Sequence, residues 1–460
     1  MSANTCSFFR RTTLNFADPK TTRAIPFFNV LWAELSKFDI TIHYAHPTSK
    51  DIVRLASVSY LVEKPEQSHA TSWVSRLLDR AYGGSQRRKR IKVLINPFSG
   101  SGKAPKWYIR DIEPIFAAAR CEVDVERTQF SGHGVDIAEN LDIDAYDVIA
   151  SCSGDGLPHE VFNGLGRKED AARALSKIAV VHLPCGSGNA MSWNLNGTGS
   201  PSMAALCTVK GIQTPLDLIS ITQGDKRYLS FLSQSVGIVA ESDLGTEHLR
   251  WMGEVRFTYG FLIRLLRKTI YPCDLAVKLE VPTKTQIKEH YRRELANHAA
   301  SSSRRDLHLE AGLPPLKYGS INSPLPPDWT VVPCGKLGNF YAGNMAFMAA
   351  SSNFFPASLP NDGCLDLVTV DGDINRSTAF NSLFAMEKGT FFDLPHVNYR
   401  KVSAYRIIQR EREGYVSIDG ERVPFEPFQA EVHRGLGTVL SRSGYVYEAK
   451  GVVEGTKEGS

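Results

Sequence analysis

The sequence predicts a doubly wound α/β domain followed by an antiparallel β-sandwich, with a small N-terminal extension. Two observations favour this architecture. Between residues 91 and 183, short apolar stretches alternate with helical ones, which is typical of parallel β-α-β units. From residue 216 onward, strand-like stretches dominate, which favours a sandwich or a curled sheet. The length of 460 residues suits two domains and one additional segment.

The α/β domain is predicted over residues 91–215, after an extension that covers residues 1–90. Short apolar runs predict its strands, and the longer stretches between them predict its helices. We expect strands at 91–95, 121–128, 147–152 and 179–183, and helices at 105–120, 134–140 and 159–165. The extension is interpreted as a small β-rich regulatory segment, with alternating strands at 39–44 and 52–62 and a basic linker at 87–90.

The second domain is predicted over residues 216–450, and residues 451–460 are interpreted as a flexible tail. A helix is expected at 249–269, and a mobile surface insertion without regular structure at 283–327, because serine, arginine and proline interrupt any periodicity there. The predicted strands lie at 214–222, 227–239, 275–281, 338–349, 365–370, 401–408 and 415–418.

Composition narrows the class of protein. Hydrophobic residues make up 42% and charged residues 22%, which predicts sizeable cores. A net charge of +4 is too small for this length to predict a nucleic-acid partner. The 8 cysteines lack the two-residue spacing of zinc and redox motifs, so reduced thiols in a reducing compartment are expected. No signal peptide and no apolar stretch of about 18–20 residues is visible, so any membrane contact is expected to be peripheral.

Three glycine-rich turns follow predicted strands. The first runs from Asn96 to Lys103 (Asn-Pro-Phe-Ser-Gly-Ser-Gly-Lys), the second from Ser153 to Glu160 (Ser-Gly-Asp-Gly-Leu-Pro-His-Glu), and the third over 184–190 (Pro-Cys-Gly-Ser-Gly-Asn-Ala). Glycine lets backbone N–H groups approach a ligand, and a following helix favours negative charge. One such turn alone is more simply a tight connection, but three in one sheet predict a site for the phosphates of a nucleotide.

Two well-known nucleotide motifs are excluded. Pro97 and Ala104 stand where a P-loop needs glycine and a hydroxyl residue. His159 and Met191 stand where the dinucleotide fingerprint needs its third glycine. The sequence therefore predicts neither a P-loop kinase nor a dehydrogenase.

Asp155 is the candidate catalytic residue. It lies between two glycines at the end of an apolar strand, where a carboxylate is unexpected unless it has a structural or functional role. Capping of the following helix is the structural interpretation. The functional one, which we favour, is a general base that accepts a hydroxyl proton during phosphoryl transfer.

The three turns, in this order, resemble the diacylglycerol-kinase-type catalytic domain. The motif that begins at Ser153, Ser-Gly-Asp-Gly-Leu-x-His-Glu-Val-x-Asn-Gly, is similar to that of the sphingosine kinase branch of this family. Residues 237–244 and 252–257 resemble the sphingoid-recognition region of that branch, and 417–421 (Ser-Ile-Asp-Gly-Glu) resembles its C-terminal nucleotide-contacting motif. The resemblance covers about residues 91–442 apart from the insertion. Val236 and the pair Phe98-Ser99 depart from the pattern of some members.

The resemblance implies a role for each matching residue, with ATP and Mg²⁺ as cofactors and Asp155 as the base. No residue is assigned as a metal ligand. The nucleotide would be bound by Asn96, Phe98, Ser99, Gly100, Ser101, Gly102, Lys103, Thr128, Ser153, Gly154, Gly156, Glu160, Gly186, Ser187, Gly188, Asn189, Arg250, Arg256, Asp419, Gly420 and Glu421. The lipid would be bound by Ser233, Glu241, Asp243, Leu249, Met252, Phe257 and Phe261.

Asp243 fits a cationic lipid on chemical grounds as well. A sphingoid base carries an ammonium group at its head, so an acidic residue beside an apolar pocket complements it. A solvated loop charge is the alternative interpretation of Asp243.

The implied activity is transfer of the ATP γ-phosphate to the primary hydroxyl of a sphingoid long-chain base, which gives the 1-phosphate. A diacylglycerol or ceramide kinase of the same fold is the alternative, and an NAD kinase or a non-catalytic lipid-binding protein is a further one. The implied partners are the sphingoid base and a membrane surface; nucleic acid is not implied, and a homodimer is left open. The expected location is the cytoplasm, with peripheral association to intracellular or plasma membranes.

The stretch 361–366 (Asn-Asp-Gly-Cys-Leu-Asp) also resembles a segment that holds a structural metal in bacterial lipid kinases. We expect instead a simple β-turn with two exposed aspartates, Asp362 and Asp366.

Overall fold

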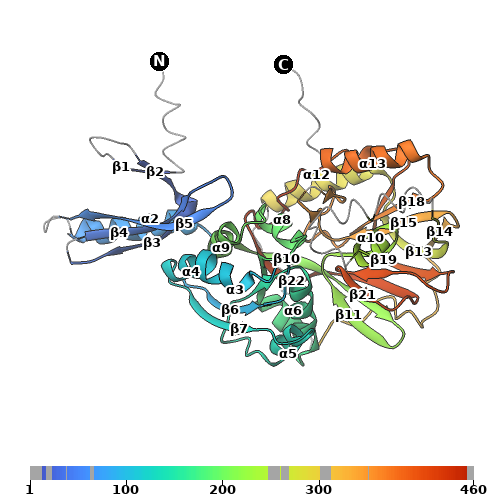
Figure 1. Cartoon of the computed structure of the whole chain (residues 1–460), viewed down its shortest axis with the longest axis horizontal. Helices are drawn as coiled ribbons and strands as arrows, with labels where there is room; N and C mark the ends of the chain where they lie inside the picture. The colour runs from blue at the N-terminus through green and yellow to red at the C-terminus, as the bar shows by residue number, and fades with distance from the viewer. Residues whose placement is uncertain are drawn as a thin grey trace, which may run out of the picture.

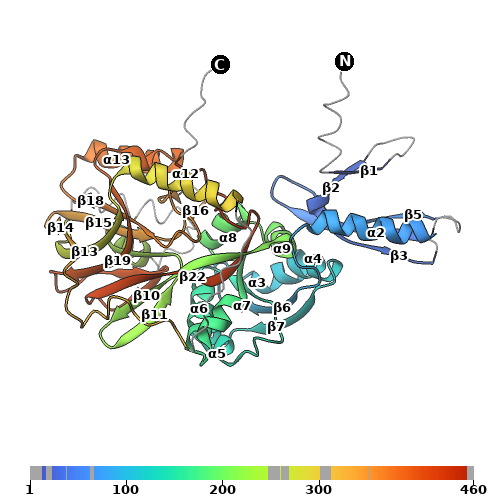
Figure 2. The same cartoon turned by 180° about the vertical axis from the view of Figure 1, so that it is seen from behind.

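The computed structural model describes residues 13–16, 23–37, 39–62, 67–246, 260, 269–300, 312–350 and 352–452. Figures 1 and 2 show the N-terminal sheet (blue) at one end, the α/β domain (cyan to green) beside it, and the β-rich domain (yellow to red) at the other end. The predicted fold class is confirmed.

The N-terminal unit contains a three-stranded antiparallel sheet, a separate two-stranded antiparallel sheet and one helix. Its elements are β1 (Thr13–Phe16), β2 (Arg23–Pro26), η1 (Phe27–Asn29), β3 (Val30–Leu35), β4 (Asp39–Pro47), β5 (Val53–Leu61) and α2 (Gln67–Tyr82). β3, β4 and β5 pair in order. β4 and β5 correspond to the two predicted strands, whereas β3 was not predicted. The prediction missed α2, although its apolar residues recur every three or four positions.

This unit packs on the α/β domain. Its apolar residues belong to the same core cluster as those of the first parallel strand. Arg54 forms an ion pair with Asp111, with 2.5 Å between Nη1 and Oδ1. The buried Lys210 donates to the Ala81 carbonyl at the end of α2. Polar contacts as well as the core therefore hold the two parts together.

The α/β domain contains four parallel strands in the order β7-β6-β8-β9. Each predicted strand and helix is present, with η3 as a π-helical turn inside the first helical stretch. The elements are β6 (Arg90–Ile95), α3 (Ala104–Trp107), η3 (Tyr108–Ile112), α4 (Glu113–Ala118), β7 (Glu122–Arg127), α5 (His133–Asn140), β8 (Val148–Ser153), α6 (Gly156–Arg167), α7 (Ala171–Lys177), β9 (Ala179–Pro184), α8 (Ala190–Asn196) and α9 (Pro201–Lys210).

The β-rich domain is mainly antiparallel. Its strands are β10 (Ile212–Gln223), β11 (Lys226–Ser230), β12 (Ser233–Gly237), β13 (Cys273–Val281), β14 (Thr330–Cys334), β15 (Leu337–Gly343), β16 (Phe347–Ala349), β17 (Ser352–Asn353), β18 (Leu365–Asp371), β19 (Asn398–Gln409), β20 (Val416–Ile418), β21 (Glu421–Val423) and β22 (Phe428–Ser441). Its helical elements are α10 (Ile238–Leu244), α12 (Lys284–Ala300), α13 (Arg376–Lys388) and η5 (Phe391–Asp393).

The last strand joins the two domains. β22 pairs with β10 and β19 in the β-rich domain and also runs parallel to β9, where Val439 is opposite Val180. The chain therefore returns to the first domain after it has built the second. This shared strand fixes the turns at the ends of the parallel strands relative to the β-rich domain.

The irregular insertion predicted at 283–327 is wrong over its first part, which forms α12. Ile287 and Tyr291, one helical turn apart, are buried, while most of the helix is polar. So narrow an apolar stripe gave little periodic signal. The helix predicted at 249–269 lies outside the described residues except at its end and at Gly260, and the tail lies outside them from residue 453.

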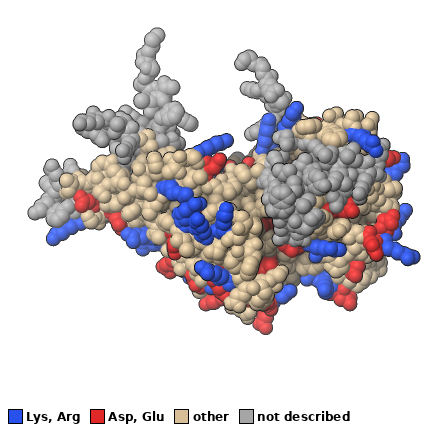
Figure 3. Space-filling model, viewed as in Figure 1, with Lys and Arg blue, Asp and Glu red and all other residues tan. Residues whose placement is uncertain are grey.

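Two surface properties bear on partners. In the part of the chain that the structure describes, no helix is both long and apolar enough to cross a membrane. Basic and acidic side chains are interspersed on the face shown in Figure 3.

Candidate active site

The three glycine-rich turns pack against one another at the carboxyl ends of β6, β8 and β9. The Gly154 N–H donates to Ser99 Oγ at 2.7 Å and so joins the first two turns. A Cβ atom at Gly186 would lie 2.5 Å from Gly154 Cα, and one at Gly100 would lie 2.5 Å from the Cys185 carbonyl oxygen. Because any side chain would collide with backbone, these glycines are required for the turns to meet.

A cavity of about 910 Å³ runs along the turns and into the β-rich domain. Most of the predicted site residues line it. These are Asn96, Phe98, Ser99, Gly100, Thr128, Ser153, Gly154, Asp155, Gly156, Glu160, Gly186, Ser187, Gly188, Ser233, Asp243, Asp419, Gly420 and Glu421.

Some predicted residues do not line the cavity. Ser101, Gly102 and Lys103 follow the first turn but are not part of the cavity wall. Asn189 supports the third turn instead, because its side-chain amide makes two hydrogen bonds of 2.9 Å with the Gly186 backbone. The other predicted residues Leu249, Arg250, Met252, Arg256, Phe257 and Phe261 lie outside the described residues.

Asp155 stands at the start of α6, but its carboxylate does not cap that helix. It accepts instead from the first two N–H groups of α8: Oδ2 is 3.0 Å from Ala190 N, and Oδ1 is 2.9 Å from Met191 N. The second and third turns are therefore joined through this carboxylate. The hydrogen bonds also fix its orientation on the cavity wall.

Glu160 and Asp419, both predicted to bind the nucleotide, have structural contacts. Glu160 accepts from the backbone N–H groups of Gly132 and Gly134 at the start of α5, at 3.0 and 2.8 Å. The buried Asp419 accepts from His159 Nδ1 at 2.8 Å and from four groups of the turn between β11 and β12. Burial opposes a charged His159, but the hydrogen bond and charge of Asp419 outweigh it and raise the pKa of His159.

The lipid side of the cavity contains Ser233, Asp243 and the buried Tyr341. A Cβ atom at Gly420 would lie 3.9 Å from Asp243 Oδ2, so this carboxylate stands beside the turn between β20 and β21. Burial, together with the nearby Asp243 charge, raises the pKa of Tyr341, which keeps its hydroxyl protonated as a donor. Glu241 accepts a hydrogen bond of 2.5 Å from Tyr271 and does not line the cavity.

Three contributors to the site were not predicted. Phe130, which is 56% exposed, lines the cavity as Phe98 does. Tyr341 is the second. The third, His182, is a buried residue of β9 whose Nδ1 lies 3.6 Å from Asp155 Oδ1. A histidine inside the apolar run Ala-Val-Val-His-Leu, just before a glycine turn, was the available signal.

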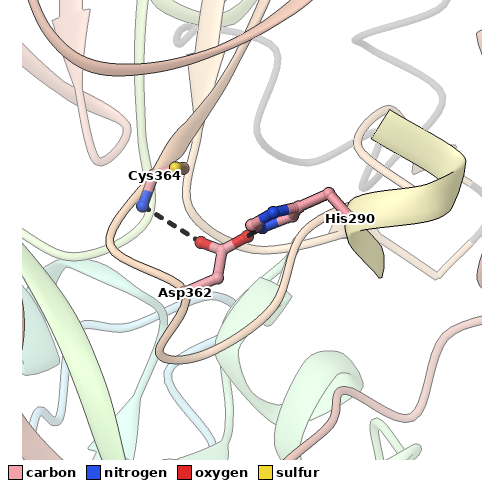
Figure 4. A group of neighbouring side chains, drawn as sticks. All are labelled: His290, Asp362 and Cys364. Atoms are coloured by element: carbon pink, nitrogen blue, oxygen red, sulfur yellow. Dashed lines mark hydrogen bonds and ion pairs between the residues drawn. The ribbon is translucent and has the colours of Figure 1, made fainter. Parts of the chain in front are cut away.

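The prediction of two exposed aspartates at 361–366 is wrong. Asp362 and Asp366 are buried, and Lys401 Nζ lies between them at 2.7 and 3.1 Å from their Oδ2 atoms. His290, Asp362 and Cys364 lie together (Figure 4), and one potential ligand atom of each is within 4.8 Å of the others. Because the Lys401 ammonium already supplies positive charge here, burial of an ion pair explains the acidic residues.

Comparisons with known proteins agree with this geometry. Residues 90–221 match the family model of the diacylglycerol kinase catalytic domain, and residues 339–441 match the YegS C-terminal NAD kinase beta sandwich-like domain. Residues 2–83 match a domain of unknown function, DUF7493.

Whole-chain relatives decide the family. The chain is 35% identical to sphingoid long chain base kinase 4 of Schizosaccharomyces pombe, over 91% of this chain and 88% of that protein. It is 34% identical to sphingoid long chain base kinase 5 of Saccharomyces cerevisiae, over 88% of this chain and 67% of that protein. The chain belongs to the sphingoid long chain base kinase family.

More distant relatives of this family member extend the match. It is 29% identical to human sphingosine kinase 1, over 75% of this chain and 88% of that protein. A crystal structure of a putative diacylglycerol kinase from Bacillus anthracis has the same fold, with a TM-score of 0.54 at 17% identity over 78% of this chain and 96% of that chain.

Proposed function

We infer that this chain is an ATP-dependent lipid kinase that phosphorylates the primary hydroxyl of a sphingoid long-chain base. The observation that carries this proposal is that one cavity is lined by the three glycine-rich turns, by Asp155 and by Asp243. A phosphate cradle, a base and a partner for an ammonium group are the three elements that the reaction needs.

The nucleotide phosphates would lie along the three turns. Because their glycines carry no side chains, the turns leave room for a close approach of the phosphates, and α6 and α8 begin directly after the second and third turns, where a helix start favours negative charge. Phosphoryl transfer depends mainly on alignment and on neutralising charge, and these turns supply both. The exposed rings of Phe98 and Phe130 at the same cavity would contact the base of the nucleotide.

Mg²⁺ would accompany the nucleotide and neutralise part of the phosphate charge. Carboxylate oxygens suit this cation. A Cβ atom at Gly156 would lie 2.5 Å from Glu421 Oε1, so such an oxygen stands against the second turn. These residues fit a magnesium–nucleotide complex, and we assign no protein ligand to the metal.

The lipid would enter from the β-rich domain. Its ammonium group would pair with Asp243, and Ser233 and Tyr341 would contact its polar head. The apolar side chains of Met348, Phe354 and Met386 line the same cavity and would contact the hydrocarbon chain of the lipid. Such a substrate resides in membranes, so we propose peripheral contact with a membrane surface.

Asp155 would take the proton of the primary hydroxyl. As the lipid oxygen bonds to the γ-phosphorus, the bond from phosphorus to the departing ADP oxygen breaks, and the hydroxyl proton moves to the carboxylate. The hydrogen bonds from Ala190 and Met191 hold the carboxylate in place for this step.

The first experiment is transfer of labelled phosphate from ATP to a panel of sphingoid base, ceramide and diacylglycerol. We expect label on the sphingoid base. Asp155→Asn should keep ATP affinity within about threefold and lower kcat by about 10²-fold or more. Asp243→Asn should raise KM for the sphingoid base by roughly 10- to 100-fold, the loss of one charged hydrogen bond.

The exposed Asp225→Asn is the matched control and should behave as wild type. Near-normal turnover of Asp155→Asn would contradict the assigned base. Preferential labelling of ceramide or diacylglycerol, neither of which has the ammonium group, would overturn the role of Asp243. No labelled lipid at all would overturn the proposed activity.

A further inference from the structure

His182 is a buried titratable side chain that the proposed reaction does not yet use. Its side chain is 0% exposed. Nε2 lies 2.8 Å from the Ser153 carbonyl oxygen, while Nδ1 lies 3.6 Å from Asp155 Oδ1 and has no hydrogen-bond partner among the described residues. A buried polar atom without a partner costs about 1–3 kcal/mol, so this placement calls for a reason.

The contact with Ser153 determines which nitrogen carries the proton. A carbonyl oxygen only accepts, so Nε2 is the protonated nitrogen. In the neutral ring, Nδ1 is then an unprotonated acceptor on the side of Asp155. It can accept a hydrogen bond only from a carboxyl group that has gained a proton.

The other partners of Asp155 act in the opposite direction. The N–H groups of Ala190 and Met191 donate to its two oxygens and favour the charged carboxylate. A base must also hold the proton once it has accepted it. The unprotonated Nδ1 favours that second state, because it repels the carboxylate and accepts from the carboxyl.

We propose that His182 is a positioning residue that holds the proton taken up by Asp155, an inference that rests on the proposed function of Asp155. When the lipid hydroxyl proton reaches the carboxylate, the new O–H donates to His182 Nδ1, after a small shift that closes the 3.6 Å separation. This step moves a proton only, and nothing is oxidised or reduced. The proton returns to solvent after the phosphorylated lipid departs.

The groups around His182 leave Asp155 as its acid–base partner. On α6, His159 is bonded to Asp419, and Glu160 to two backbone amides. On β8, Cys152 belongs to the core cluster of the other sheet face, beside Cys185. Neither α8 nor residues 436–441 of β22 contain a titratable side chain.

Two substitutions distinguish the contributions of the two ring nitrogens of His182. His182→Gln places an amide N–H where Nε2 was and keeps the bond to Ser153, but it removes the acceptor beside Asp155. His182→Asn places an amide near Nδ1 and loses the bond to Ser153. Ser151→Ala is the control, because Ser151 pairs in register with His182 and has a buried hydroxyl with no hydrogen-bond partner in the part of the chain that the structure describes.

We expect His182→Gln to lower kcat by roughly 10- to 100-fold, a part of the usual contribution of acid–base catalysis. ATP affinity should stay within about twofold, and Ser151→Ala should match wild type. The acidic limb of the kcat profile, measured between about pH 5 and 9, should move to lower pH, because the protonated carboxyl is less favoured. In an Asp155→Asn background, His182→Gln should cause no further loss.

Wild-type kcat and an unchanged pH profile in His182→Gln would overturn the inference about His182. If Asp155→Asn itself turned over normally, the proposed base would fail instead, so the two failures are distinguishable. If the variants do not fold, a measurement on the unmodified enzyme still tests the proposal. Nitrogen NMR of labelled histidine should show His182 protonated at Nε2 and bare at Nδ1, and a proton on Nδ1 at neutral pH would refute the proposal.

Discussion

Replacing Lys401 by methionine should strongly destabilise the β-rich domain. Lys401 is fully buried, and its ammonium is 2.7 Å from Asp362 Oδ2 and 3.1 Å from Asp366 Oδ2. At an effective dielectric constant of about 20, each attraction is roughly 5–6 kcal/mol. Desolvation of the ammonium cancels much of this, so we expect a net loss of about 3–5 kcal/mol, the usual cost of breaking a buried pair.

The loss should depend on pH. Without the ammonium, burial and mutual repulsion push the carboxyl pKa values of Asp362 and Asp366 above their unfolded values. Such groups stabilise the fold most at low pH, and the stabilisation is lost as the pH rises through the folded pKa. Burial already raises the pKa of Asp366 in the intact protein. Lys401→Met should therefore be less destabilising near pH 5 than near pH 7.5.

The assay is hydrogen exchange of the β19 backbone amides, which reports the opening free energy without assuming two-state unfolding of a multidomain chain. Lys336→Met is the matched control, because Lys336 Nζ is also 2.7 Å from a carboxylate, that of Asp373, but the side chains are 70% and 51% exposed. We expect about 1 kcal/mol or less for it. Equal effects of the two substitutions, or no pH dependence for Lys401→Met, would refute the reasoning.

Gly186→Ala should lower ATP affinity at least tenfold, because its Cβ would lie 2.5 Å from Gly154 Cα, whereas Gly335→Ala, with open space around it, should not; equal ATP binding would contradict this. Lys210→Met should flatten the pH dependence of stability: burial lowers the pKa of Lys210 to about 7, below its unfolded value, so wild-type stability should rise between about pH 7 and 10, as melting temperatures would reveal. Phe130→Ala should raise KM for ATP roughly 5- to 100-fold at unchanged kcat, and Phe130→Trp should not, if the exposed ring stacks on the base.

The fold and the nucleotide side of the site could be predicted because their signals are local. Three of the four parallel strands, β6, β8 and β9, are mostly apolar runs followed by a glycine-rich turn, so the strand and its turn at the sheet edge are both indicated by the same short stretch of sequence. α12 was missed because, among its described side chains, Ile287 and Tyr291 are the only buried apolar ones, and charged and polar residues surround them in the sequence.

The ion pairs could not be predicted because they depend on contacts between distant residues. Asp362 looks like a turn residue, and nothing near it in the sequence shows that Lys401, on another strand, comes within 2.7 Å. The sequence offered Asp155 a cap on the helix that directly follows it, but the two hydrogen bonds come instead from the start of α8, 35 residues later. A carboxylate at the end of a strand indicates a site, and tertiary structure decides its partners.

Asp419 illustrates how a motif that resembles a binding motif can act through position. Its five donors come from α6 and from the turn between β11 and β12, so this one carboxylate connects the nucleotide side of the cavity to the lipid side. Asp419→Asn should break this connection, because an amide N–H would face the N–H of Phe231 or His159. It also removes the partner that raises the pKa of His159, and with it a stabilisation that is full below the unfolded pKa and lost as the pH rises through the folded one.

We expect Asp419→Asn to raise KM for both ATP and the sphingoid base, because the nucleotide side and the lipid side of the cavity would no longer be held in a fixed relative position. Two unpaired donors at about 1–3 kcal/mol each should also lower stability. Steady-state kinetics with each substrate varied in turn, at a temperature where the variant is folded, measures the coupling. A variant that loses stability but keeps both KM values would mean that Asp419 supports the fold alone. A rise in the KM for ATP alone would instead indicate that Asp419 contacts the nucleotide directly.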